Sequence, residues 1–362
     1  MTIGFIGLGL IGGSIAKAVR RVHPDARLIA WNRTASVLVE AMREGVIDQQ
    51  CFEITESFRE CDIVFLCVPV LTMRGLLTEL KDHLKKDAII TDVGSTKGDI
   101  HTLVAELDLL PHFIGGHPMA GSEKSGYQYS SDRLLENAWY ILTPGPEIPI
   151  AKLSAFSEFI SSLGALPLIL TPEEHDYIAA CVSHVPHVIS ASLVNMVRDL
   201  DGPEEFMKTI AAGGFKDITR ISSSSPQMWQ EICLANADNI CIVLDRYIRS
   251  LTDFRFAIRN ENGEKLLQYF SDCRAYRESF SDESSGPIRK DFRIYADLAD
   301  ETGAIANISA VLADGGISIR NIGIVHNREF EQGVCCIGFY DADSAKRAKT
   351  LLEGRSYHIY EV

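Results

Sequence analysis

The chain has 362 residues, of which 46% are hydrophobic and 23% charged, values that are ordinary for a soluble globular protein of two or three domains. Its 49 acidic residues outnumber 35 basic ones, and the net charge of −14 argues against general nucleic-acid or anionic-membrane binding. The sequence has no apolar run of membrane-spanning length, no signal-peptide pattern and no CxxC pair among its nine cysteines. We therefore expect a cytoplasmic protein with reduced thiols and with neither nucleic-acid nor membrane partners.

Short apolar strands alternate with helical patterns over residues 1–165. The predicted strands are Ile3–Ile6, Arg27–Trp31, Ile63–Val68, Ala88–Asp92 and Phe113–Gly115. Strands separated by helices of this length predict a mostly parallel sheet, with right-handed crossovers and helices on both faces.

The rest of the chain divides into a helical block, a linker and a tail. Residues 166–280 predict an all-α domain, with helical patterns at Glu173–Leu200, Glu204–Ala212, Gln227–Ser250 and Thr252–Ser271. An apolar helical domain of this kind commonly forms a subunit contact, so we expect a homodimer. Residues 281–290 have the composition of a linker. Residues 291–362 predict the order βαββαβ, a small α+β domain with two helices on one face of a sheet.

A dinucleotide-binding fingerprint follows the first predicted strand and opens a helix. It reads Gly7-Leu8-Gly9-Leu10-Ile11-Gly12. The glycines allow a tight turn, close approach of a pyrophosphate and close helix–strand packing, as in a Rossmann-type α/β domain. At the end of the second strand Asn32 and Arg33 stand where an acidic residue usually binds the ribose of NAD, so the cofactor is NAD or NADP. Val68, which ends another predicted strand, is assigned to the same site.

A histidine lies among glycines in the segment Gly115–Gly126, where His117 is followed by Glu123. An imidazole held close to a ligand can exchange protons near neutral pH, although turns are also rich in glycine for local reasons. Ser183–His187 and Gly213–Arg220 bring together imidazole and basic groups that suit a small anionic substrate. A solvated helix face is the alternative for Lys216 and Arg220. We expect no metal site, because His184 and His187 have no partners at ligand spacing.

Taken together, these motifs resemble the prephenate dehydrogenases of tyrosine biosynthesis over nearly the whole chain. Gly94–Gly98 and Trp229 belong to the same pattern. The resemblance implies NAD(P)-dependent oxidative decarboxylation of prephenate to 4-hydroxyphenylpyruvate. It also implies catalytic roles for His117, which would accept the proton of the substrate hydroxyl, and for Ser95, which would support that hydroxyl or the nicotinamide. The substrate-binding residues that it implies are Arg220 at a carboxylate, together with His184, His187, Gly213, Lys216, Trp229 and Glu123.

The tail resembles an ACT regulatory domain through Asp300–Ile305 and Gly315–Ile322. Thr302-Gly303 stands where these domains usually have Pro-Gly. Because ACT domains commonly bind an amino acid, the resemblance implies feedback regulation by L-tyrosine, with Gly303 and Asn321 as the regulatory residues.

Three alternatives stay open on the sequence. Arogenate dehydrogenase would run the same chemistry on a substrate with an amine in place of the ketone. A β-hydroxyacid or 6-phosphogluconate type dehydrogenase also joins a Rossmann domain to helices, but lacks the His117 segment and the tail. A non-catalytic amino-acid sensor would not need both His117 and Arg220.

Overall fold

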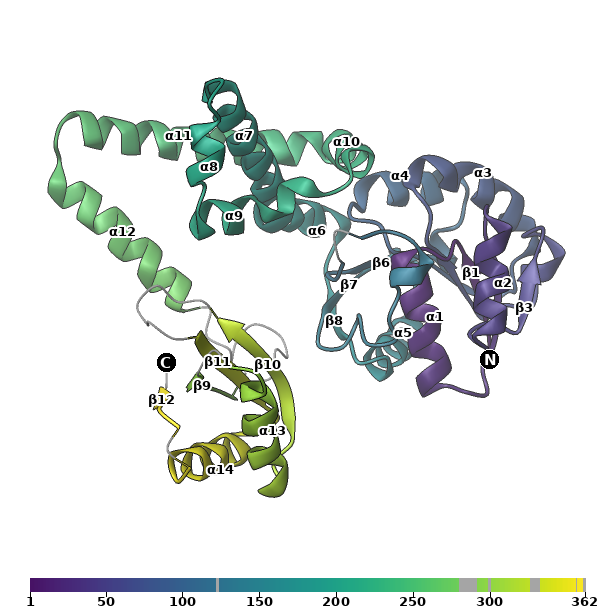
Figure 1. Cartoon of the computed structure of the whole chain (residues 1–362). Helices are drawn as coiled ribbons and strands as arrows, with labels where there is room; N and C mark the ends of the chain where they lie inside the picture. The colour runs from purple at the N-terminus through teal and green to yellow at the C-terminus, as the bar shows by residue number, and fades with distance from the viewer. Residues whose placement is uncertain (122–123, 280–291, 299–300, 326–332, 356, 361–362) are drawn as a thin grey trace. The chain divides into compact units, whose positions relative to one another are not determined.

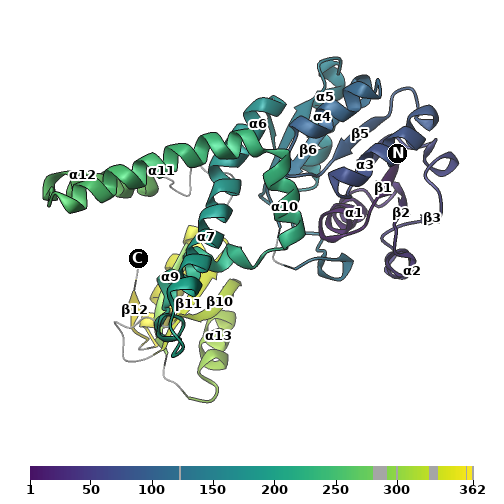
Figure 2. The same cartoon turned by 90° about the horizontal axis from the view of Figure 1, so that it is seen from above.

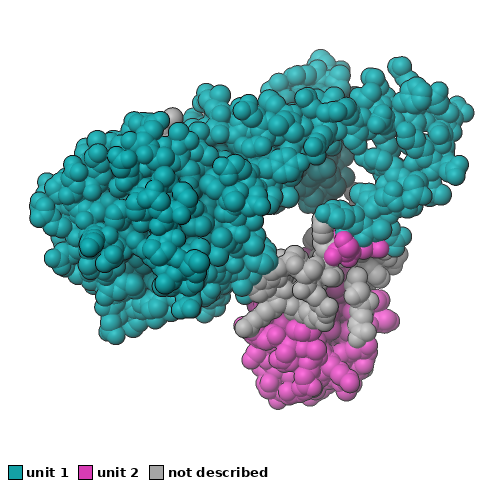
Figure 3. Space-filling view, turned by 180° about the vertical axis from the view of Figure 1, so that it is seen from behind, with its two compact units in different colours: residues 1–276 teal, residues 277–362 magenta. Residues whose placement is uncertain are grey.

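The computed structural model describes residues 1–121, 124–279, 292–298, 301–325, 333–355 and 357–360. It has two compact units, residues 1–276 and residues 277–362, which Figure 3 colours separately. The predicted linker, residues 281–290, lies outside the described residues.

The first unit begins with a five-stranded parallel sheet (Figure 1). Its strands are β1 (Thr2–Ile6), β2 (Arg27–Trp31), β3 (Gln49–Cys51), β4 (Ile63–Leu66) and β5 (Ile89–Asp92), paired in the order β3-β2-β1-β4-β5. The helices of this part are α1 (Leu10–Val22), α2 (Ala35–Arg43), α3 (Val70–Leu80) and α4 (Gly98–Glu106). The chain order reverses between β1 and β4, which creates the crevice at the carboxyl ends of the strands where α/β proteins bind ligands.

A second, mixed sheet continues the first, in agreement with the mostly parallel arrangement that the sequence predicts. It consists of β6 (Ile114–Pro118), β7 (Trp139–Pro144) and β8 (Leu166–Ile169), with α5 (Ile150–Ser162) between the last two. The strands β6 and β7 are antiparallel, whereas β7 and β8 are parallel. A parallel bridge between Ile90 and Phe113 joins the two sheets at their edges. Because β8 pairs with β7, the helical part begins after β8 and not before it.

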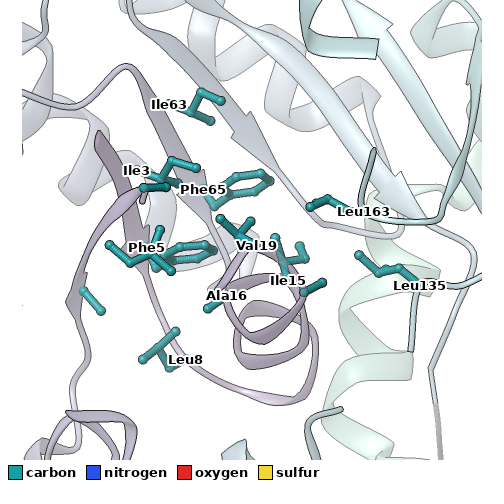
Figure 4. Packing of buried hydrophobic residues seen from close by; sticks show 14 of the residues in the cluster. Ile3, Phe5, Leu8, Ile15, Ala16, Val19, Ile63, Phe65, Leu135 and Leu163 are labelled. Carbon is teal, nitrogen blue, oxygen red and sulfur yellow. The ribbon is translucent and has the colours of Figure 1, made fainter. Parts of the chain in front are cut away.

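The core beneath the crevice is built on aromatic and branched side chains (Figure 4). Phe5 of β1 stacks on Phe65 of β4 with ring centroids 5.2 Å apart, and both are fully buried. Ile15 and Val19 of α1 are fully buried in the same cluster. Burying each such side chain contributes about 1.5–3 kcal/mol to folding. This packing holds the amino end of α1 directly after β1, where the glycine fingerprint lies.

The helical part extends from the sheets as a bundle with a long arm formed by α11 and α12 (Figures 1 and 2). Its helices are α6 (Pro172–Ala179), α7 (Val185–Leu200), α8 (Phe206–Ile210), α9 (Gly213–Thr219), α10 (Pro226–Ala235), α11 (Ala237–Arg259) and α12 (Gly263–Glu278). The predicted break near Ser250 is wrong, because Thr252 lies within α11 and its hydroxyl donates to the Ile248 carbonyl at 2.8 Å. The chain instead breaks at Asn236 and at Glu261, whose φ of 52° ends the helix.

One turn of π-helix, Ala180–His184, joins α6 to α7. The continuous helix Pro172–Leu200 has 29 residues and contains an 18-residue stretch with a mean hydropathy of 1.4, which by length and composition alone is enough to cross a membrane. The expectation that the chain has no such segment is therefore wrong for this helix. A core helix of a folded domain passes the same criterion, and this helix forms hydrogen bonds with α4 through its first turns, as described below.

The second unit has the expected element order βαββαβ. Its elements are β9 (Phe292–Leu298), α13 (Ala304–Asp314), β10 (Ile319–Val325), β11 (Gly333–Phe339), α14 (Ala342–Glu353) and β12 (Ile359–Tyr360). The antiparallel sheet has the order β10-β11-β9-β12, and its apolar side chains form a separate core with α13 and α14. A separate core of this kind is typical of a small domain that folds as its own unit.

Candidate active site

The glycine fingerprint forms the turn from β1 into α1. Gly7 has a φ of +99°, which side chains rarely adopt, and a Cβ there would lie 2.8 Å from Val68. A Cβ at Gly12 would overlap the Gly7 carbonyl oxygen, whereas a Cβ at Gly9 would meet no atom within 4 Å. Gly7 and Gly12 therefore close the turn, and Gly9 leaves its backbone open beside the amino end of α1. That arrangement fits the pyrophosphate of a dinucleotide, because a helix amino end with free N–H groups attracts phosphate.

The other residues assigned to the cofactor lie around this turn. Leu8 is buried, while Leu10 and Ile11 are half-buried in the first turn of α1. The side chain of Asn32 accepts a hydrogen bond from the Leu8 amide at 3.0 Å and donates to the Thr34 carbonyl at 3.0 Å. Asn32 thus holds the glycine turn against the end of β2, and the neighbouring Arg33 is exposed.

His117 lies on β6 and is joined to a second histidine. Its Nδ1 is 2.7 Å from Nε2 of His175 on α6, and Nδ1 of His175 is 2.8 Å from Oδ1 of Asp176. His117 is 8% exposed and His175 is fully buried. Burial, with smaller contributions from His175 and Lys97, holds the pKa of His117 well below its ordinary value. The His117 ring is therefore neutral and able to accept a proton at neutral pH.

Asp176 docks the helical part onto the sheet. Its carboxylate accepts hydrogen bonds from the backbone amides of Lys97 at 2.7 Å and Gly98 at 2.8 Å, at the amino end of α4. Burial alone would raise its pKa, but the hydrogen bonds from His175 and from these two amides lower it. The carboxylate is therefore ionised and stabilised by the helix amino end.

A buried ion pair shapes the segment between β5 and α4. The Lys97 ammonium, which is fully buried, pairs with the Asp92 carboxylate. Asp92 also accepts from the Gly94 amide at 2.8 Å and from the Gly116 amide at 3.1 Å. One carboxylate thus fixes the Ser95 segment and the strand of His117 next to each other at the carboxyl end of β5.

His184, in the π-helical turn, is fully buried beside that segment. Its Nδ1 lies 3.2 Å from the side-chain amide of Asn236, which also donates to the Asp176 carbonyl at 2.7 Å. Burial lowers the pKa of His184 to about 4, and the Ser95 backbone partly opposes this shift. No described residue gives its Nε2 a hydrogen-bond partner. A π-turn and an orphaned buried nitrogen are both frequent at functional sites.

The remaining predicted substrate residues form an aromatic and cationic wall. The rings of His187 and Trp229 stack with centroids 3.8 Å apart, and His184 meets the edge of Trp229. Burial lowers the pKa of His187, and the positive charge of nearby Arg220 adds to this effect. Arg220 begins a 3₁₀ turn after α9 and is exposed. The structure therefore brings Arg220, His187, Trp229 and His184 into one group.

Three other residues are predicted to bind the substrate. Lys216 is exposed on α9. Gly213 begins α9 with open space around it. Glu123 lies outside the described residues. Within the described ranges the structure also has no cluster of three His, Cys, Asp or Glu side chains that could hold a metal.

Sequence reasoning missed His175, Asp176 and Asn236. His175 follows Glu173-Glu174 in the first turn of a helix whose capping box joins Thr171 and Glu174, so the segment has the composition of a solvated helix start. The only available signal was a histidine next to an acidic residue, which is weak without knowledge of the partner strand.

Comparison with known proteins agrees with this site. Residues 15–170 match the family model "Prephenate dehydrogenase, nucleotide-binding domain", and residues 171–272 match "Prephenate dehydrogenase, dimerization domain". A prephenate dehydrogenase of Bacillus subtilis is 38% identical over 359 residues, which cover 98% of this chain and 96% of that protein.

Two solved structures resemble the first unit. One is the prephenate dehydrogenase of Aquifex aeolicus in complex with hydroxyphenyl propionate and NAD⁺, with a TM-score of 0.73, 33% identity and coverage of 78% of this chain and 98% of that one. The other is a Synechocystis arogenate dehydrogenase, with a TM-score of 0.70, 29% identity and coverage of 77% and 100%. The chain therefore belongs to the prephenate dehydrogenase family and is an NAD(P)-dependent dehydrogenase.

Proposed function

We propose that this protein oxidises and decarboxylates prephenate to 4-hydroxyphenylpyruvate in tyrosine biosynthesis. The observation that carries the proposal is His117 on β6, a buried and neutral imidazole whose Nδ1 is hydrogen-bonded to His175. Two relatives that match most of the chain, from Bacillus subtilis and Lactococcus lactis, are named prephenate dehydrogenase.

His117 acts as the general base in this proposal. When bound, the nicotinamide ring supplies the hydride acceptor. Nε2 of His117 accepts the proton of the ring hydroxyl as the carbon that bears it is oxidised, and the loss of carbon dioxide then leaves an aromatic ring. A base that is neutral at working pH suits this role. Ser95, fixed by the Asp92 network, supports the same hydroxyl.

The group around Trp229 binds the rest of the substrate. Arg220 pairs with a carboxylate, because a guanidinium binds carboxylates through two parallel hydrogen bonds. His187 stacks on Trp229 and orients the wall of the pocket. Buried His184, next to the Ser95 segment, supports the wall of the site through its edge contact with Trp229. Lys216, Gly213 and Glu123 stay predicted members of the site.

The direct test is the rate of nicotinamide reduction by purified protein with prephenate, measured by near-ultraviolet absorbance with NAD and NADP in parallel. Product identification as 4-hydroxyphenylpyruvate, with release of carbon dioxide, would support the proposal. Folded protein that binds the dinucleotide but reduces neither cofactor with prephenate would contradict it.

Arogenate is the second candidate substrate, because a Synechocystis arogenate dehydrogenase shares the fold of the first unit. The two substrates share the ring and its carboxylate and differ in a ketone or an amine on the side chain. A comparison of kcat/KM for both with the same enzyme preparation distinguishes them. A higher value for arogenate would replace prephenate in the proposal.

The protein acts as a homodimer through its helical part in this proposal. Large apolar side chains are exposed there, among them Leu200, Phe206, Phe256 and Leu267, which are 63–71% exposed. The matched family model is described as a dimerization domain. Exposed apolar patches of this kind mark protein contacts. Light scattering after size exclusion tests the stoichiometry, and a monomer at micromolar concentration would contradict it.

The second unit is proposed to be an ACT-type domain that binds L-tyrosine and inhibits the enzyme. Gly303 has a φ of +93° and open space at the amino end of α13, and Asn321 is exposed on the edge strand β10. These two residues give a small amino acid a backbone turn and an amide to bind. Saturating tyrosine that alters neither the rate nor the Tm would contradict this part of the proposal.

A further inference from the structure

We propose that Asp176, acting through His175, fixes the tautomer of His117 so that its Nε2 is the hydrogen-bond acceptor that faces the substrate. This inference rests on the proposed role of His117 as the base. It adds two positioning residues, which touch neither the substrate nor the cofactor in the proposed reaction.

The proton positions follow from Asp176 outward. A carboxylate can only accept hydrogen bonds, so Nδ1 of His175, 2.8 Å from Oδ1 of Asp176, must carry a proton. In a neutral His175 ring the other nitrogen, Nε2, then has no proton and can only accept. His117 Nδ1, 2.7 Å away, must therefore be the donor. This leaves Nε2 of His117 with a free lone pair.

Asp176 can determine which nitrogen of each imidazole carries the proton, because its carboxylate is ionised and held in place. The Lys97 and Gly98 amides donate to its two oxygens, and the Asn236 side chain donates to its main-chain carbonyl at 2.7 Å. His175 is fully buried, so water does not compete for either of its nitrogens. With one end of the chain of hydrogen bonds fixed, both imidazoles are oriented as well.

The same chain stabilises His117 after it accepts a proton. The imidazolium then has a proton on both nitrogens, and Nδ1–H keeps its bond to His175, which in turn keeps its bond to the Asp176 carboxylate. No bond has to change partner during the step, and no proton needs to move to Asp176. Loss of such an orienting carboxylate costs about 10⁴ in kcat in enzymes where it holds a histidine in the reactive tautomer.

The tautomers are tested directly by ¹⁵N NMR of the full-length protein labelled on histidine, in the absence of substrate. We expect one protonated nitrogen on each ring, Nδ1 for His117 and Nδ1 for His175. Protonation of His117 on Nε2, or of both nitrogens of His175, overturns the inference. Because this readout requires no turnover, it can succeed even if prephenate is not the substrate.

Two variants separate the tautomer effect from packing. In His175→Gln the side-chain oxygen replaces the accepting Nε2, whereas His175→Leu has a similar volume and no acceptor. We expect His175→Leu to lower kcat by about 10²–10³, with KM for prephenate and Kd for NAD within about threefold of the wild type. The kcat of His175→Gln should be at least about tenfold higher than that of His175→Leu.

The matched control is His23→Leu, a histidine that bonds Ser162 on another side of the sheet and should leave kcat unchanged. Equal rates for His175→Gln and His175→Leu would overturn the positioning role, as would a change in KM alone. If His175→Leu does not fold, the tautomer measurement on the wild type decides the question. An inactive wild type with the expected tautomers would contradict the proposed substrate and not this inference.

Discussion

Two alanine substitutions in the glycine turn should have different effects: Gly12→Ala should lower the stability of the fold, and Gly9→Ala should weaken cofactor binding. In Gly12→Ala the added methyl overlaps the Gly7 carbonyl oxygen and lies 2.8 Å from Cβ of Cys67. A backbone oxygen cannot rotate away, so we expect overpacking of about 1–3 kcal/mol, offset by up to about 1 kcal/mol from the better helix propensity of alanine. With a Tm change of about 2–4 °C per kcal/mol for a unit of this size, Gly12→Ala should melt several degrees lower.

In Gly9→Ala the same methyl meets no protein atom within 4 Å. Gly9 has φ −93° and ψ −153°, which alanine adopts freely. The apo Tm should therefore stay the same or rise slightly, because alanine lowers the entropy of the unfolded chain. The methyl does occupy the space in which a pyrophosphate would approach the backbone. We expect at least a tenfold weaker Kd for NAD, a loss of about 1.4 kcal/mol.

Thermal unfolding without ligand and calorimetric titration with NAD measure the two effects on the same samples. The reasoning would be refuted if Gly9→Ala bound NAD as tightly as the wild type. It would also be refuted if Gly9→Ala lost as much stability as Gly12→Ala, because both would then act on packing within the protein.

Four further predictions address the chemistry and the charges. His117→Asn should bind NAD normally and lower kcat by about 10²–10⁴ in initial-rate assays, and a near-normal kcat would remove it as the base. Arg220→Ala should mainly raise KM for prephenate, and an unchanged KM would place the carboxylate contact elsewhere. Arg33→Ser should lower kcat/KM with NADP relative to NAD, since it removes a cation near the expected 2′-phosphate. A variant with the same NADP-to-NAD ratio of kcat/KM as the wild type would mean that Arg33 does not contact the cofactor. The pKa of His184 is about 4 in the folded protein and about 6.5 in the unfolded chain, so between these values only the unfolded chain binds the extra proton. As the pH is lowered from 6.5 to 4, His184 should therefore lower the free energy of unfolding by about 1.4 kcal/mol per pH unit. Equal denaturation midpoints at the two ends of that window would contradict the assignment of a buried neutral His184.

The α/β part was predictable because its signals are local. The strands Ile3–Ile6 and Arg27–Trp31 are buried runs bounded by the glycine turn and by loop residues, and the structure places β1 and β2 there. The strand β3 was not predicted, since it has three residues, two of them glutamine, and depends on pairing with β2 for its existence. Tertiary pairing overrides local preference in such short strands.

The candidate site divides in the same way. Motifs dense in glycine or histidine mark His117 and His187 from the sequence alone. Asp92 and Lys97 lie within or next to a predicted strand end, but their pairing depends on both being fully buried. A buried charge pair leaves no periodic pattern in the sequence, because its partners are chosen by the fold.

The hydrogen bonds that join the helical part to the sheet also belong to the candidate site. The amino end of α4 attracts a carboxylate by its free amides, and Asp176 supplies one from α6. That contact places His175 against His117, and Asn236 ties the same helix turn to His184. The contact that joins the helical part to the sheet is therefore also the one that orients the proposed base. A substitution that loosened this docking would be expected to lower kcat before it lowered the affinity for NAD, because the dinucleotide turn lies on β1 and α1, where none of these hydrogen bonds reaches.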